Sequence, residues 1–126
     1  MGFSAGAHLA GLAAARYDAV NPAADGIDRE SAKPAFQALI YPPKIDVAYS
    51  KDTPQAFIAC GGDDQVSVGV PEMYQALKAA GVPAELHIYA GVGHGFAIRA
   101  GNSPRLAGWI ERFRDWMSDR GLLAPK

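Results

Sequence analysis

The sequence predicts an α/β fold in which helices cover a parallel sheet. Three short apolar stretches of strand length are interleaved with segments of helical periodicity, in the order helix, strand, strand, helix, strand, helix. This alternation is typical of parallel α/β structures. The apolar character of the short stretches also fits strands that are buried on both faces of a sheet.

The first half of the chain contains one expected helix, a loop and one expected strand. Residues 5–16 consist mainly of Ala and Leu, which are strong helix formers. Residues 18–35 contain Asn-Pro, Asp-Gly and Lys-Pro pairs, which favour a loop. Residues 36–41 read as a buried strand that ends at two consecutive prolines.

The second half contains two further strands and two helices. Residues 55–60 form an apolar run, and residues 84–89 alternate between apolar and polar side chains, so both ranges are expected to be strands. Residues 71–80 begin with a proline and are followed by Gly81, which are helix start and stop signals. Residues 104–120 carry a wide apolar stripe at helical spacing.

The expected sheet is narrow, because three strands leave two of them as edges. We therefore expect the whole chain, residues 1–126, to be one partial domain with an incomplete sheet. An uncovered edge exposes unpaired N–H and C=O groups, so self-association through the sheet edge is also expected.

Composition excludes several functional classes. The net charge of −1 comes from interspersed acids and bases, whereas binding of nucleic acid needs a concentrated basic face. No apolar run is long enough to cross a bilayer, so no membrane partner is expected. The one cysteine, Cys60, lies in an apolar run and is expected to be a buried thiol. The first residues lack a signal-peptide pattern, which gives a cytoplasmic location by default.

The chain begins with a motif that can activate a serine. The sequence Gly-Phe-Ser-Ala-Gly at residues 2–6 fits G-x-S-x-G, in which the serine occupies a sharp turn between a strand and a helix. The N–H of the next residue, here Ala5, stabilises an oxyanion in this motif. A simple glycine-serine turn that caps the helix is the alternative.

A carboxylate and a histidine follow two of the expected strands. Asp63 and Asp64 come after residues 55–60, and His94 lies in a glycine-rich loop after residues 84–89. In parallel sheets, ligand sites lie at the carboxyl ends of strands. Asp63 is therefore placed where a carboxylate that orients a histidine belongs, with Asp64 as the alternative. His8 and His87 are weaker candidates for the base.

The combination is more informative than its parts. The order Ser, Asp, His is the chain order of the triad in α/β-hydrolases. A serine needs a base to take its proton, and the base needs a carboxylate to hold its tautomer. We therefore expect Ser4, Asp63 and His94 to converge, without a metal or an organic cofactor.

The chain resembles the acetylxylan-esterase and carboxylesterase-like serine esterases of the α/β-hydrolase superfamily. The resemblance runs through GFSAGAHLA, KPAFQALIYP, GGDDQVSV, YQALKAAGVPAELHIY and GVGHGFAIR, which together span nearly the whole chain. It implies Ser4 as nucleophile, Asp63 as acid and His94 as base. It also implies that the chain is the C-terminal half of the fold. The N-terminal strands and the His-Gly-Gly-type loop that supplies further oxyanion donors are then missing.

The resemblance implies hydrolysis of carboxylic esters of small acyl groups, such as acetyl groups on plant polysaccharide. The expected partner is a small-molecule or carbohydrate ester. A serine peptidase of the prolyl-oligopeptidase type and an inactive truncated remnant are the two alternatives. The chain alone is expected to be a poor enzyme, because only the Ala5 N–H remains among the expected oxyanion donors.

Overall fold

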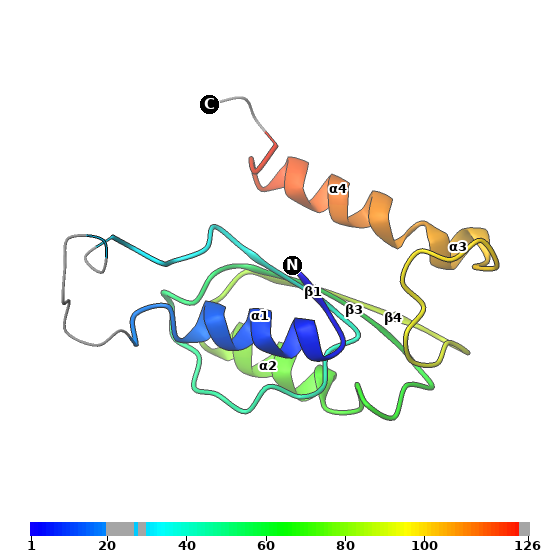
Figure 1. The fold of residues 1–126 in the computed structure, drawn as a ribbon, viewed down its shortest axis with the longest axis horizontal. Helices are drawn as coiled ribbons and strands as arrows, with labels where there is room; N and C mark the ends of the chain where they lie inside the picture. The colour runs from blue at the N-terminus through cyan, green and yellow to red at the C-terminus, as the bar shows by residue number, and fades with distance from the viewer. Residues whose placement is uncertain (20–26, 28–29, 124–126) are drawn as a thin grey trace.

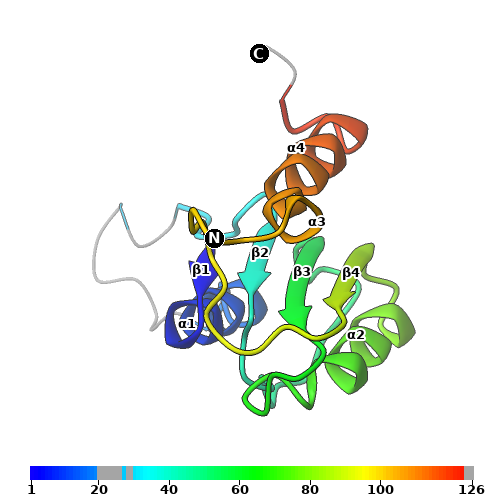
Figure 2. The same ribbon diagram turned by 90° about the vertical axis from the view of Figure 1, so that its right-hand side faces the viewer.

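A parallel sheet of four strands forms the centre of the molecule. The computed structural model describes residues 1–19, 27 and 30–123. The strands lie in the order β1 (Gly2–Phe3), β2 (Gln37–Ile40), β3 (Ala56–Gly61) and β4 (Ala84–Tyr89). All neighbours are parallel (Figure 2). The predicted α/β class is confirmed, and the two residues before Ser4 add a short fourth strand to the three that periodicity indicates.

Helices cover both faces of this sheet. The helices α1 (Ala5–Ala15) and α2 (Val70–Ala79) pack on one face, while α3 (Pro104–Ala107) and α4 (Trp109–Asp119) lie on the other (Figures 1 and 2). Strands β2 and β3 are buried along their whole length, as expected for strands between two helical layers. Much of the expected loop before β2 lies outside the described residues.

The last predicted helix is interrupted. Residues 104–120 were expected to form one helix, but Gly108 ends α3 and precedes α4. Glycine is a poor helix former because its backbone loses the most freedom on ordering. The Ser103 hydroxyl accepts a hydrogen bond from the Leu106 N–H at 3.3 Å and caps the start of α3, as a serine at the N-cap position of a helix commonly does.

Aromatic side chains join α4 to the sheet. Phe57 of β3 lies 5.1 Å from Phe113 and 5.8 Å from Trp116, measured between ring centroids. Burial of such a side chain stabilises the fold by about 1.5–3 kcal/mol. Because α4 is anchored in this way, the loop between β4 and α3 is held at both ends.

The outward face of α1 remains apolar. Ala5, Leu9 and Ala13 are exposed, and Leu9 has 68% of its surface in contact with solvent. A helix that is apolar all round is typical of a buried position. The self-association expected at the sheet edge stays a prediction.

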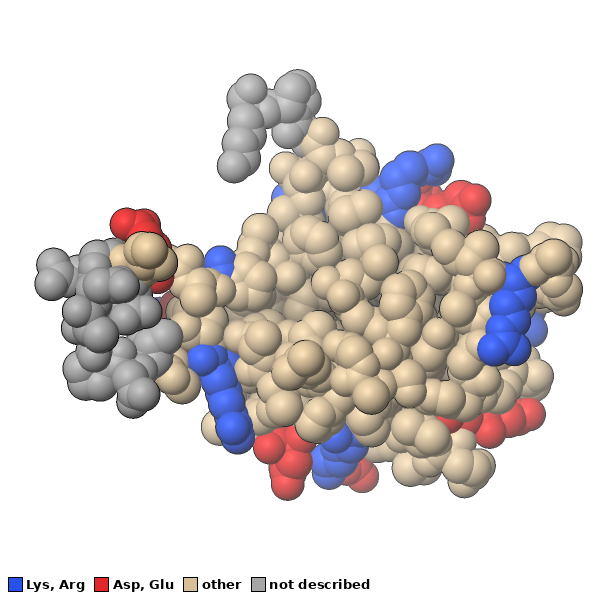
Figure 3. Space-filling model, in the orientation of Figure 1, with Lys and Arg blue, Asp and Glu red and all other residues tan. Residues whose placement is uncertain are grey.

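Charged groups are scattered over the visible surface. Figure 3 shows Lys and Arg side chains that lie apart from each other and alternate with Asp and Glu, without a continuous basic patch on that face. Among the described residues, no helix is long and apolar enough to cross a membrane.

Cys60 lies at the end of β3 with only 2% of its surface exposed, as expected for a core thiol. Burial, with a smaller contribution from the charge of Asp64, raises the pKa of this thiol from 9.0 to about 11. Since the thiolate is the reactive form, we expect a thiol reagent to modify the native chain about 100-fold more slowly than the unfolded chain. Equal rates of modification with and without denaturant would contradict this prediction.

Candidate active site

Ser4 occupies a strained turn between β1 and α1. Its φ of 51° lies in the left-handed region, which non-glycine residues rarely adopt and which costs of order 1–3 kcal/mol. The Ser4 N–H donates to the Ile40 carbonyl at 2.9 Å, which ties the turn to β2. A Cβ at Gly2 would lie 2.1 Å from the Gly6 carbonyl oxygen, so only glycine allows the strand and the helix to approach so closely. The sequence shows the helix after Ser4 but no strand before it, and the structure adds that strand as the two residues Gly2–Phe3.

Three side chains form a continuous hydrogen-bonded chain at the carboxyl end of the sheet. The Ser4 Oγ lies 2.8 Å from the His94 Nε2. On the other side of the ring, the His94 Nδ1 lies 2.8 Å from the Asp64 Oδ2. An ionised carboxylate only accepts hydrogen bonds, so the proton belongs on Nδ1 and the Nε2 is left to accept from the serine hydroxyl. This is the tautomer that a general base for Ser4 requires.

The structure brings Asp64 to His94, and not the expected Asp63. The Asp63 side chain is exposed, whereas Asp64 has 4% of its surface exposed. The main chain explains the difference. The Asp63 N–H donates to the Val92 carbonyl at 3.0 Å, while the Val66 N–H donates to the Asp64 Oδ1 at 2.9 Å and holds that carboxylate in a turn. The second residue of the pair therefore faces inward.

Asp64 is held in its charged form. Burial by itself raises the pKa of this carboxyl, but the hydrogen bonds from His94, Ser67 and the Val66 N–H outweigh it and hold the pKa below the ordinary value. The Ser67 hydroxyl lies 2.8 Å from Asp64 Oδ2 and 3.0 Å from the Pro42 carbonyl oxygen. Because the folded-state pKa is lowered, Asp64 contributes stability at neutral pH that is lost as the pH falls through that pKa.

The loop that carries His94 packs directly on the end of β3. A Cβ at Gly61 would lie 2.1 Å from the Val92 carbonyl oxygen, so glycine is required for this approach. The Gly62 N–H also donates to the Tyr89 carbonyl at 2.8 Å. The loop around His94 is therefore tied by its backbone to the turn that carries Asp64.

The same loop is fixed further along by α4. The Ala97 carbonyl accepts hydrogen bonds from the Trp109 Nε1 at 3.1 Å and from the Asn102 Nδ2 at 3.0 Å. Ala97 has a φ of 33°, a second strained position beside the site. These contacts fix the segment that leaves His94 on its C-terminal side.

Tyr41 is a site residue that the sequence patterns did not single out. It follows β2, its φ is 41°, and its ring centroid lies 4.9 Å from that of His94 in an edge-on arrangement. A tyrosine at the end of an apolar strand is normally interpreted as a core residue, so the sequence did not indicate its contact with His94. Ser67 was also missed, although it follows Asp64 at the three-residue spacing of a side-chain hydrogen bond within a turn.

Ala5 is the first residue of α1 and follows Ser4 directly. The first N–H groups of a helix have no acceptor within the helix and form its positive end. The Ala5 N–H is therefore available for an oxyanion beside Ser4, and its role as a donor stays a proposal.

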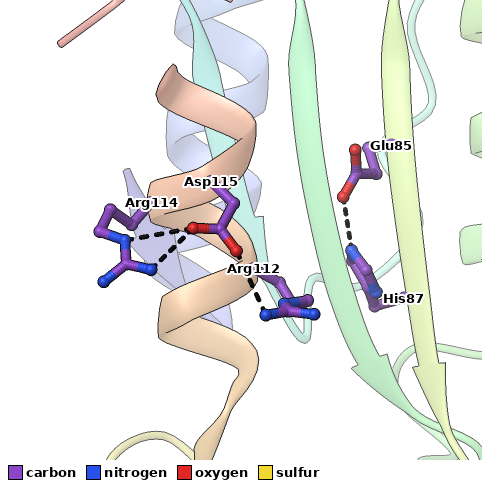
Figure 4. A network of polar contacts seen from close by, with 5 residues as sticks. All are labelled: Glu85, His87, Arg112, Arg114 and Asp115. Atoms are coloured by element: carbon purple, nitrogen blue, oxygen red, sulfur yellow. Dashed lines mark hydrogen bonds and ion pairs between the residues drawn. The ribbon is translucent and has the colours of Figure 1, made fainter. Parts of the chain in front are cut away.

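The other two histidines lie elsewhere. The His87 Nε2 is 2.7 Å from the Glu85 Oε1 in a half-buried pair on β4, across from the Arg112, Arg114 and Asp115 contacts of α4 (Figure 4). His8 lies within α1. Across residues 1–19, 27 and 30–123, no group of three or more His, Cys, Asp or Glu side chains is arranged to hold a metal ion.

A strained serine before a helix, with a histidine and a buried carboxylate at the carboxyl ends of parallel strands, is the arrangement expected of an α/β-hydrolase. The chain belongs to the dienelactone hydrolase family, whose model matches residues 1–117. The expected resemblance to the α/β-hydrolase esterases is thus confirmed. A comparison with curated proteins gave no match.

Solved structures of esterases are similar to the chain over nearly its whole length. The acetyl ester-xyloside bifunctional hydrolase from Caldicellulosiruptor lactoaceticus is 26% identical, with a TM-score of 0.79 over 95% of this chain and 55% of that one. Esterase 2 of Thermogutta terrifontis, phosphorylated by paraoxon, is 25% identical, with a TM-score of 0.69 over 98% and 55%. The chain therefore spans little more than half the length of these structures.

Proposed function

We propose that the site hydrolyses carboxylic esters of small acyl groups, with Ser4 as nucleophile, His94 as general base and Asp64 as the acid. The observation that carries this proposal is the unbroken path of two 2.8 Å contacts from the Ser4 Oγ through His94 to Asp64. Membership of the dienelactone hydrolase family and the similarity to esterase structures support it.

The first half of the reaction forms an acyl-enzyme. The Ser4 Oγ attacks the carbonyl carbon of the ester while its proton passes to the His94 Nε2. Asp64 stabilises the imidazolium that results, because its carboxylate accepts the Nδ1–H. The Ala5 N–H donates to the oxygen that gains negative charge. The C–O bond to the alcohol then breaks, and His94 returns its proton to the departing oxygen.

The second half releases the acid. A water molecule gives a proton to His94 and attacks the acyl carbon, and the bond to the Ser4 Oγ breaks as the serine regains its proton. Every proton that leaves a reacting oxygen passes through the Nε2 of one histidine. No metal ion or organic cofactor is needed to balance either step.

The substrate class follows from the relatives rather than from the site itself. One structural relative is described as an acetyl ester-xyloside hydrolase and is 26% identical to the chain. We therefore favour acetyl esters, including those on plant polysaccharide, as the substrates of the whole protein.

A panel of chromogenic substrates tests this function. We expect turnover of p-nitrophenyl acetate, slower turnover of longer acyl chains and none of an aminoacyl p-nitroanilide. A preference for the anilide would instead indicate a peptidase.

The panel should be measured on the chain and on a fusion with the remaining part of the Caldicellulosiruptor hydrolase. We expect the fusion to be faster, because loss of one oxyanion donor typically costs about 100- to 1,000-fold in rate. Absence of ester turnover in both proteins would refute the proposed function.

A further inference from the structure

Tyr41 lies between the nucleophile and the acid in the sheet. It follows Ile40 of β2, and β2 is hydrogen-bonded to β1 on one side and to β3 on the other. The Tyr41 N–H donates to the Ala59 carbonyl at 2.7 Å, so its backbone is fixed to β3. Ser4 follows β1 and Asp64 lies in the turn after β3, which leaves Tyr41 at the strand end between them.

The Tyr41 ring is buried among three other rings, those of Phe3, Phe96 and His94. It is 6% exposed and lies 5.0 Å from Phe96 and 6.0 Å from Phe3, measured between ring centroids. Its contact with His94, at 4.9 Å and an interplanar angle of 70°, is the shortest of the three. A bulky side chain persists at a φ of 41° only where its surroundings hold it.

The two hydrogen bonds of His94 leave one motion of its ring weakly restrained. One bond holds the Nδ1 to Asp64 and the other holds the Nε2 to Ser4. Together they fix the position of the imidazole on the line between these two residues. Rotation about that line changes neither distance much. The His94 side chain is 33% exposed and its neighbours in the chain are Gly93 and Gly95, which add no side-chain wall. A ring packed edge-on against the imidazole blocks this rotation.

We propose that Tyr41 is a positioning residue that holds the plane of the His94 imidazole in line with the Ser4 hydroxyl. It acts through the shape of its aromatic ring and not through its hydroxyl, so phenylalanine can replace it and an aliphatic residue cannot. The proposal rests on the proposed function of the site, since orientation of the base matters only if His94 takes the serine proton. It adds a fourth residue to the three that the hydrogen bonds join.

Variants at residue 41 and a matched tyrosine test the role. We expect Tyr41→Leu and Tyr41→Gly to lower kcat by about 10- to 100-fold with KM within about threefold, because small misplacement of a reacting group is costly. Tyr41→Phe should retain kcat within about threefold. Glycine accepts a positive φ, so Tyr41→Gly removes the ring without the backbone strain of Tyr41→Leu.

Tyr89→Leu is the control, because Tyr89 is 8% exposed and also contacts Phe96, at 6.0 Å. It removes a buried ring while the contact between the Tyr41 and His94 rings is kept, so we expect a loss of stability with little change in kcat. Equal losses of kcat in Tyr41→Leu and Tyr89→Leu would overturn the proposal. So would undiminished kcat in both Tyr41→Leu and Tyr41→Gly.

The Nδ1–H proton resonance of His94 gives a readout that does not depend on turnover. We expect a sharp signal in the unchanged chain, in Tyr41→Phe and in Tyr89→Leu, and a broadened or absent signal in the two variants without a ring at residue 41. A sharp signal in Tyr41→Leu and Tyr41→Gly, or none in the unchanged chain, would overturn the role of Tyr41. Failure of both the unchanged chain and the fusion to turn over esters would instead count against the proposed function.

Discussion

Replacement of Ser4 by alanine is expected to lower kcat for ester hydrolysis by about a million-fold, to the rate that binding and the oxyanion donor alone support. The reason is that alanine has no oxygen that can attack the carbonyl carbon, so no acyl-enzyme forms. The loss should appear in kcat, with little change in folding, because the Ser4 backbone rather than its hydroxyl bonds to Ile40. Hydrolysis of p-nitrophenyl acetate measures it.

An organophosphate reagent adds a direct assignment of the nucleophile. The structure of the Thermogutta terrifontis esterase phosphorylated by paraoxon shows that a relative reacts with such a reagent. Mass spectrometry of the labelled chain should place the adduct on Ser4, and Ser118→Ala, at an exposed position of α4, should leave the labelling intact. Labelling that persists in Ser4→Ala would show that another residue is the nucleophile.

The matched pair Asp64→Asn and Asp63→Asn is expected to separate two adjacent carboxylates. Asparagine keeps the shape of Asp64 but removes its charge and allows the wrong histidine tautomer, which costs about 10⁴-fold in kcat in a serine protease triad. We expect a loss of this size for Asp64→Asn. Asp63→Asn should stay within about threefold, because the Asp63 side chain is exposed and its backbone contact to Val92 is kept.

Thermal unfolding of both variants provides the control for stability. Asp64→Asn also weakens the turn that Ser67 and the Val66 N–H stabilise, so its activity should be measured well below its melting temperature. If Asp63→Asn lost activity while Asp64→Asn kept it, the assignment of the acid would be wrong.

The fold was largely predictable because most helices and strands show a characteristic periodicity in the sequence. Alternation of apolar strands with helical segments gave the class, and the strand at residues 84–89 has the predicted bounds. The break at Gly108 was not foreseen, because the apolar spacing continues across it and a single glycine is often tolerated in a helix. The short strand before Ser4 has only two residues, too few for any periodicity.

The side-chain contacts of the candidate site were predictable to within one residue. Ser4 and His94 lie in distinctive glycine-rich settings, so their contact could be anticipated from motif and order. The choice between Asp63 and Asp64 depends on which side chain faces inward, and that is decided by main-chain hydrogen bonds to Val92 and from Val66. The contact of Tyr41 with His94 was not predicted, because the apolar pattern of a strand does not show how an aromatic ring at its end is oriented.

The backbone contacts between the turn at Asp64 and the loop at His94 have a consequence for motion. The N–H groups of Gly62 and Asp63 donate to the carbonyls of Tyr89 and Val92, and Gly61 lets the two segments touch. The segments that carry Asp64 and His94 are thus hydrogen-bonded to each other, whereas Ser4 is hydrogen-bonded to Ile40 of β2. We therefore expect thermal motion to change the distance from His94 to Asp64 less than the distance from the Ser4 Oγ to the His94 Nε2. The serine proton would cross this second distance in the proposed reaction.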